Sequence, residues 1–210
     1  MKKVFRLVAV LAAAIMAATA FVAPAATAAS NVKVGLAYDI GGRGDKSFND
    51  SAAAGLDLAK KNLKVTAREV TVTQGTDSER EDKLRLLAKA GYNPIIAVGF
   101  LYAGPIKKVA ADYPNVSFGI IDDSSVDLLN VAGLVFAEEQ GSYLAGVAAA
   151  LATKSGKVGY IGGVRIPLLQ KFEAGFVAGV KATKASATVD VKYITEPPDF
   201  GGFNLSLIHI

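Results

Sequence analysis

The 210-residue sequence contains no cysteine and a single histidine, His209. The absence of cysteine excludes disulfide bonds, thiolate metal sites, cysteine nucleophiles and a lipid-modified N-terminal cysteine. The sequence also lacks a G-x-S-x-G nucleophile motif, a G-x-x-x-x-G-K-[ST] phosphate loop and any obvious cluster of metal ligands. These absences favour a binding protein over an enzyme, and we expect no cofactor and no metal.

Residues 1–28 have the pattern of a secretory signal peptide. Cations near the start precede an apolar, alanine-rich run over 7–22, and Ala26-Thr27-Ala28 supplies an A-x-A cleavage site. The run is short for a membrane span of ~20 residues, so export is favoured over anchoring. We therefore expect a periplasmic or secreted protein. The formal charge of +4 includes these cations, and the remaining balance gives no reason to expect nucleic acid as a partner.

The chain ends in LSLIHI, residues 205–210. This segment resembles the conceptual translation of a transposon-end sequencing adapter, and we hypothesise that the natural sequence continues differently beyond Asn204. A genuine apolar C-terminal strand is the alternative. Resequencing the locus decides between them, because a stop codon directly after Ile210 in a clean assembly would remove the hypothesis. If the tail is foreign, the rest of the chain offers no histidine chemistry.

Apolar, β-branched runs alternate with amphipathic helical patterns along the rest of the sequence. The expected strands are 32–38, 69–73, 95–99, 116–121, 131–136, 157–161 and 189–195. The expected helices are 48–63, 78–90, 103–112, 138–154 and 168–183. Strands that are apolar on both faces and separated by helices predict an α/β fold, with parallel sheets covered on both sides.

The pattern of a strand, two glycines and a helix occurs twice. VGYIGG at 158–163 echoes VGL at 34–36 followed by Gly41-Gly42. We therefore expect two Rossmann-like lobes, which we place at 29–137 and 138–204. The second has only two complete-looking strands and is expected to be truncated. Two lobes joined by strand-like hinges can close on a ligand.

Two predicted helices begin with capping patterns. Ser47 followed by Asp50 is a loose capping box, and Thr76 followed by Glu79 is a better one. In the second of these predicted helices, 78–90, a cluster of charged residues that begins at Arg80 lies mostly outside the apolar face. We interpret that cluster as a solvated face without a function.

The segment GLAYDIGGRGDKSFNDS, residues 35–51, carries the strongest functional signal. A strand ends in Asp39, a glycine-rich loop follows, and Phe48 and Asn49 open a helix. Ligands of open α/β sheets bind where strands end and helices begin, and Asp122 follows a strand predicted to end at the same edge. Each residue has a structural alternative. Phe48 could belong to the core, Asn49 could be a cap or turn residue, and the aspartates could satisfy helix N-termini.

The same segment resembles the opening signature of the basic membrane protein family. Members are substrate-binding proteins of ABC importers, and the type member is a purine-nucleoside receptor. Further matches, collinear between 32 and 204, are VGF at 98–100, FGIIDD at 118–123, NVAGL at 130–134 and KFEAGF at 171–176. The resemblance implies a type I periplasmic-binding-protein fold, a nucleoside in the interlobe cleft, and ABC permease and ATPase components as partners.

The resemblance also implies a set of ligand-binding residues. Asp39 and Asp122 would bind ligand hydroxyls or the base edge, Phe48 would stack on the base, Asn49 would pair with it, and Phe172 would approach from the second lobe. Stacking on an aromatic ring is worth ~1–3 kcal/mol and tolerates different bases. Many relatives have a lipid-anchor cysteine that this sequence lacks.

Three other functions are compatible with parts of the sequence. A secreted hydrolase could use Asp39 and Asp122 as acid and base, as glycosidases do. A receptor could bind a sugar or another small polar solute instead of a nucleoside. A cytosolic ligand-sensing regulator would need a DNA-binding segment, which the sequence does not show.

Overall fold

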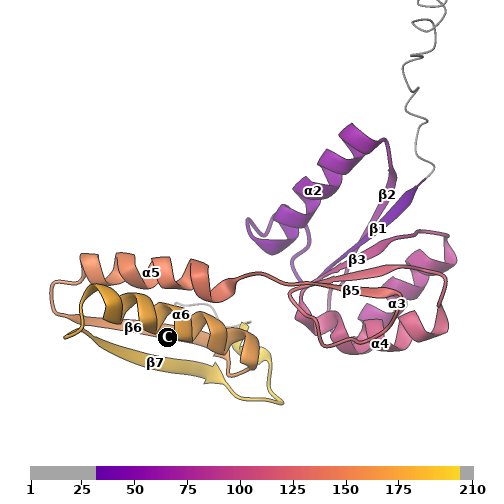
Figure 1. Cartoon of the computed structure of the whole chain (residues 1–210). Helices are drawn as coiled ribbons and strands as arrows, with labels where there is room; N and C mark the ends of the chain where they lie inside the picture. Colours follow the sequence, from indigo (N-terminus) through magenta and orange to yellow (C-terminus); the bar gives the residue numbers. More distant parts are fainter. Residues whose placement is uncertain (1–31, 204–210) are drawn as a thin grey trace, which may run out of the picture. The chain divides into compact units, whose positions relative to one another are not determined.

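The structure is a computed structural model that describes residues 32–203 (Figure 1). The predicted signal peptide at 1–28 and the predicted foreign tail at 205–210 lie outside the described residues. The chain divides into two compact units, with the boundary between Val135 and Phe136. Each unit is described by itself below.

The first unit is built on a five-stranded sheet in the order β2-β1-β3-β4-β5, and all its pairs are parallel. Its strands are β1 (Lys33–Tyr38), β2 (Thr66–Thr71), β3 (Ile95–Val98), β4 (Phe118–Ile121) and β5 (Val131–Leu134). Its helices are α2 (Phe48–Leu63), α3 (Asp77–Lys89), α4 (Ala103–Asp112) and the short 3-10 helix η1 (Phe100–Tyr102). In this doubly wound order the strand sequence reverses between β1 and β3, which is the topological switch point.

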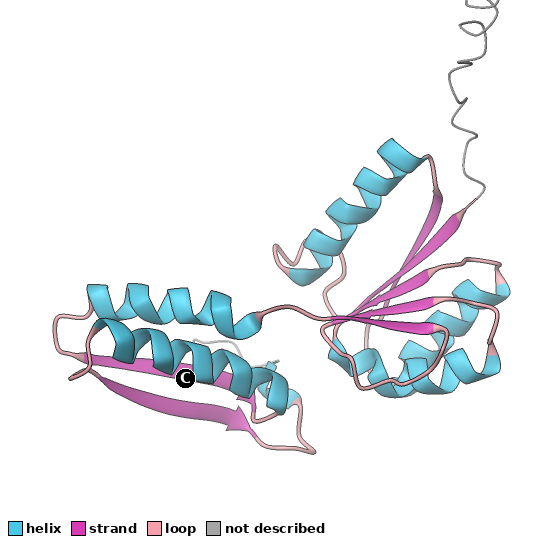
Figure 2. Ribbon diagram, viewed as in Figure 1, coloured by secondary structure: helices cyan, strands magenta, loops and turns pink. Residues whose placement is uncertain are grey.

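Helices cover both faces of this sheet (Figure 2). On one face, Leu84 and Leu87 of α3 and Ile106 of α4 are fully buried in a cluster with β-strand residues such as Ile95. On the other face, a smaller cluster joins α2 to the sheet through Leu56 and its neighbours. Burial of apolar side chains on both faces explains the near-continuous apolar sequences of β3 and β4, whereas the edge strand β2 is mostly polar.

The second unit pairs two long parallel strands, β6 (Lys157–Val164) and β7 (Thr188–Thr195), with helices α5 (Glu138–Ala152) and α6 (Pro167–Thr183). A short 3-10 helix, η2 (Gly201–Phe203), follows. Exposure alternates along both strands, and the inward-facing residues Val158 and Val189 pack against the helices. Among the described residues of this unit, the two long helices α5 and α6 lie on the same face of the sheet (Figure 2), so the expectation of helices on both sides is wrong here.

The predicted α/β class with parallel sheets is confirmed. Each predicted strand and helix has a counterpart, and α2 and α4 have the predicted bounds. The capping prediction for α2 is wrong, because the Ser47 side chain makes no cap hydrogen bond. At α3 the Thr76 Oγ1 accepts from the Glu79 N–H at 3.2 Å, as the capping pattern predicts.

Candidate functional site

The loop between β1 and α2 is shaped by its glycines and by two carboxylates. Gly41 and Gly44 have φ of 98° and 101°, a region that favours glycine. Asp45 accepts backbone N–H bonds from the first residues of α2, and Asp50 accepts from Gly44 at 2.7 Å and Lys46 at 2.9 Å. These hydrogen bonds fasten the loop to the first turn of α2.

Arg43 ties this loop to the rest of the unit. Its guanidinium donates to Glu69 of β2 at 2.6 and 3.0 Å and to Asp57 of α2 at 3.0 and 3.1 Å. The Tyr38 hydroxyl also donates to Glu69, at 2.6 Å. The hydrogen bond from Arg43 is the largest of the effects that lower the pKa of Glu69. Arg43 and Asp45 thus both hold the loop, through hydrogen bonds to neighbouring elements.

Asp39 follows β1, beside the switch point of the sheet. Its Oδ1 accepts from its neighbour Ile40 N–H and from Arg80 Nη2, both at 2.8 Å. The Arg80 side chain is only 3% exposed, whereas that of Asp39 is 20% exposed. The interpretation of Arg80 as part of a solvated face is therefore wrong: it forms a buried ion pair with a predicted site residue.

A tyrosine lies against this ion pair. The Arg80 guanidinium is 5.6 Å from the centre of the Tyr102 ring, close enough for a cation–π contact. Tyr102 is fully buried, and its hydroxyl donates to the Tyr38 carbonyl at 2.8 Å. Burial raises the pKa of Tyr102, so the phenol stays a donor.

Phe48 and Asn49 open α2 in very different environments. Phe48 is 44% exposed, so it is not a core residue, which was its structural alternative. Asn49 is 4% exposed, and its Nδ2 donates to the Ile40 carbonyl at 3.3 Å. The Asn49 Oδ1 is buried without a hydrogen-bond partner among the described residues. Asn49 thus fastens the loop through its Nδ2, while its Oδ1 accepts no hydrogen bond from the described residues.

Asp122 follows β4 at the same edge of the sheet as Asp39. It has a φ of 76°, and its N–H donates to the Leu134 carbonyl at 2.8 Å. Because β3 lies between β1 and β4, the two aspartates are separated by two strand spacings, or about 10 Å. Gly99 follows β3 between them, with a φ of 107°. The aspartates therefore flank the switch point.

Phe172 is a partly buried residue of α6, in the second unit. Its carbonyl accepts from the Ser142 hydroxyl of α5 at 2.6 Å, which fixes this part of α6 against α5. Four of the five predicted residues thus belong to the first unit, at the carboxyl edge of its sheet.

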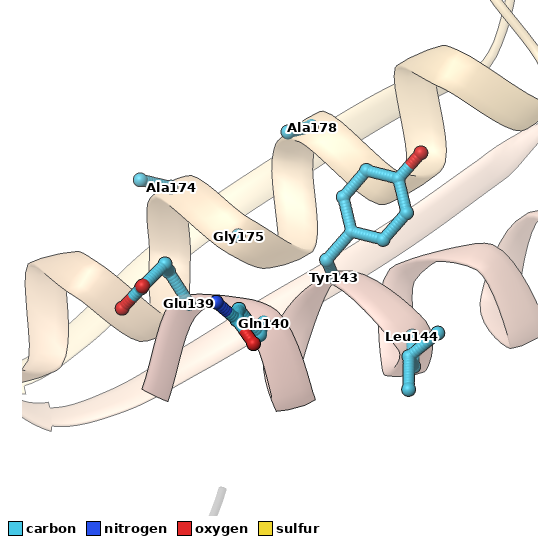
Figure 3. A pocket seen from close by; sticks show the side chains of 7 residues that line it. All are labelled: Glu139, Gln140, Tyr143, Leu144, Ala174, Gly175 and Ala178. Atoms are coloured by element: carbon cyan, nitrogen blue, oxygen red, sulfur yellow. The ribbon is translucent and has the colours of Figure 1, made fainter. Parts of the chain in front are cut away.

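The second unit carries an open groove of about 570 Å³ on α5 and α6 (Figure 3). It is lined by Glu139, Gln140, Tyr143, Leu144, Ala174, Gly175 and Ala178. The lining is mostly apolar, and none of the five predicted site residues contributes to it. This groove is unsuited to a small polar solute.

Nowhere in 32–203 do three or more potential metal-ligating side chains gather as a metal ion would require. Within the same range, no helix combines the length and apolarity of a membrane span.

The chain has two successive α/β units with parallel sheets, the first doubly wound, and its similarity to solved solute-binding proteins defines the class as a type I periplasmic-binding-protein fold. A solute-binding protein of an ABC transporter system from Aeropyrum pernix K1 is similar, with a TM-score of 0.67 and 32% identity over 78% of this chain and 47% of that chain. Residues 32–201 match the model of the family described as ABC transporter substrate-binding protein PnrA-like, and the chain belongs to this family.

Two relatives are similar to most of the chain. The "CD4+ T-cell-stimulating antigen" of Listeria monocytogenes is 37% identical over 78% of this chain and 46% of the relative. The "ABC transporter nucleoside-binding protein BmpA" of Lactococcus lactis is 34% identical over 78% of this chain and 47% of the relative. The chain spans about half the length of these relatives. The family is one of binding proteins, which is the function class that the sequence favours over an enzyme.

Proposed function

We propose that this protein is an extracytoplasmic receptor of an ABC importer and that it binds purine nucleosides. It would deliver them to permease and ATPase components at the membrane. The observation that carries the proposal is the carboxyl edge of the first unit. An acidic side chain on each side of the switch point and an exposed aromatic ring at the start of α2 match the donors and the flat base of a nucleoside.

Each residue has a proposed role. Phe48 stacks on the base, Asn49 pairs with its edge, and Asp39 and Asp122 accept hydrogen bonds from hydroxyls or from the base. Phe172 of the second unit adds an aromatic contact, a role that rests on the family resemblance. The nucleoside-binding relative in Lactococcus lactis supports this choice of ligand.

Isothermal titration calorimetry of the full-length gene product with nucleosides, nucleobases and pentoses tests the proposal. We expect purine nucleosides to bind best and to be recovered unchanged. Release of free base would support the hydrolase, and preferential binding of pentoses would support a sugar receptor.

Replacing the stacking ring gives a sharper test. Phe48→Ala should weaken nucleoside binding about tenfold or more, because base stacking is worth ~1–3 kcal/mol. Leu58→Ala is a matched control, since Leu58 is an exposed apolar residue of the same helix. Equal affinities of the two variants would argue against Phe48 as a ligand contact.

A further inference from the structure

We propose that Arg80 is a positioning residue, which holds the Asp39 carboxylate so that only Oδ2 is offered to the solute. This inference rests on the proposed function, because it assigns Asp39 to the binding site. It adds a specificity determinant from α3.

Arg80 is held in place from several directions. Its Nη1 donates to the Gly75 carbonyl at 2.6 Å and its Nη2 to Asp39 Oδ1 at 2.8 Å. Tyr102 lies against the guanidinium and donates to the carbonyl of Tyr38, the residue before Asp39. The cation and the chain segment that carries the carboxylate are thus fastened to the same buried tyrosine. Asp39 therefore has little freedom to rotate.

The two oxygens of Asp39 have different surroundings. Oδ1 already accepts two hydrogen bonds, from Ile40 and Arg80. Asp39 Oδ2 lies near Gly99. A Cβ added to Gly99 would be 3.7 Å from this oxygen. Apart from the residues next to Gly99 in the chain, no other described atom would lie within 4 Å of that Cβ. The absence of a side chain at Gly99 therefore leaves the approach to Oδ2 open, at the switch point where ligands of such sheets bind.

Two consequences for the solute follow. The buried cation compensates the charge of Asp39, so the pair suits a neutral solute better than a cationic one. With Oδ1 occupied, the carboxylate can bind one hydroxyl of the solute through Oδ2, rather than chelate a diol through both oxygens.

Lysine cannot reproduce this geometry. The planar guanidinium directs Nη1 and Nη2 to two separate acceptors, Gly75 and Asp39, whereas an ammonium is a single point charge on a flexible stem. Arg80→Lys therefore keeps the charge but loosens the carboxylate, which makes it the informative variant.

The experiment measures hydroxyl discrimination in the full-length gene product. Affinities for adenosine, 2′-deoxyadenosine and 3′-deoxyadenosine are determined for the wild type, Asp39→Asn, Arg80→Lys and Arg85→Lys. Arg85, on the same helix as Arg80, is the control because it forms a more exposed ion pair, with its Nη2 2.7 Å from Asp112 Oδ2. Asp39→Asn identifies the hydroxyl that Asp39 binds. It is the hydroxyl whose removal weakens binding to the wild type but not to this variant.

We expect Arg80→Lys to lower the discrimination for that same hydroxyl by about tenfold, since hydrogen bonds to charged groups contribute roughly 1.5–3 kcal/mol. Arg85→Lys should leave it unchanged. A purely structural role would weaken the binding of all three ligands equally, and unchanged discrimination in Arg80→Lys or Asp39→Asn would overturn the inference. A wild type that binds no nucleoside would overturn the proposed function, and this inference with it.

Discussion

At the scale of single residues, Asp45 organises the entrance to α2. Its carboxylate accepts backbone N–H bonds from Ser47 at 2.9 Å and from Asn49 and Asp50 at 3.0 Å. Desolvation alone would raise the pKa of Asp45, but these hydrogen bonds outweigh it and lower the pKa. The Asp45 side chain therefore caps the N-terminus of α2, although Asp45 lies two residues before Ser47, the N-cap residue.

Replacing these two residues separates the observed cap from the expected one. Asp45→Ala should lower the free energy of unfolding by about 1–2 kcal/mol, because several N–H groups of the first turn lose their acceptor. Ser47→Ala should have little effect, since its hydroxyl makes no cap bond. Urea denaturation followed by circular dichroism measures both. A larger loss for Ser47→Ala would show that the predicted capping box is the real one.

The pairing of Arg80 with Asp39 shows where reasoning from single residues stops. The sequence places Arg80 off the apolar face of its helix, and a charged residue in that position usually faces solvent. Its partner lies 41 positions earlier in the chain, so only the tertiary structure brings the two together. The position of Asp39 at a strand end was predictable from the pattern, but its ion pair with Arg80 was not.

At the scale of secondary-structure elements, α5 and α6 pack unusually closely. A Cβ added at Gly175 would overlap the carbonyl oxygen of Glu139, and one added at Gly179 would overlap that of Tyr143. Backbone atoms cannot move aside as flexible side chains can. These glycines are therefore required by the contact between the two helices, although glycine is a poor helix former.

Two glycine-to-alanine changes in these helices should differ clearly in their effect on stability. Gly175→Ala should destabilise the protein by about 1–3 kcal/mol or more, as overpacking does. Gly141→Ala should be neutral or stabilising by up to ~1 kcal/mol, since a Cβ there meets nothing within 4 Å and alanine favours the helix. Thermal unfolding of both variants measures the difference. A similar melting temperature for the two would contradict the close packing.

The elements themselves were predictable because their apolar periodicities are strong. Their ends were less so, and β6 is the clearest example. The sequence suggests that it ends at Ile161, before Gly162 and Gly163, which are typical of a loop. In the structure β6 continues to Val164, because its pairing with β7 supplies hydrogen bonds beyond the glycines. Strand partners far apart in the sequence decide such boundaries.

At the scale of the whole molecule, the fold and the family were accessible from the sequence, whereas the surroundings of the site were not. The alternation of strands and helices predicts the parallel sheets, and the collinear motifs from 39–50 to 171–176 indicate the family. No pattern reveals that Asn49 is buried or that Phe48 is exposed, because both begin the same helix. Burial depends on how the loop at 39–47 folds back, and that conformation depends on many contacts at once.

The carboxylates of the molecule predict a loss of stability in acid. Glu79 accepts a backbone hydrogen bond from Thr73 at 2.8 Å, and others from Gln74 and Gly75 at 2.9 and 3.1 Å. With the Thr73 bond as the largest cause, these contacts lower the pKa of Glu79 from its usual 4.5 to about 2. A carboxylate with a lowered pKa stabilises the folded state above its unfolded pKa, and this contribution disappears as the pH falls from about 5 to about 2.

The melting temperature should therefore fall over this pH range, and Glu79→Gln should flatten the curve. The variant should be less stable than the wild type at pH 7, because Gln is a weaker acceptor for three N–H groups, and the difference should shrink towards pH 2. Glu139→Gln, a change at an exposed glutamate, should keep the full acid dependence of the wild type. Differential scanning calorimetry at pH 7, 5, 3.5 and 2 measures the three curves. If Glu79→Gln lost stability in acid as steeply as Glu139→Gln, the hydrogen bonds between Glu79 and the 73–75 loop would not be responsible for the acid sensitivity.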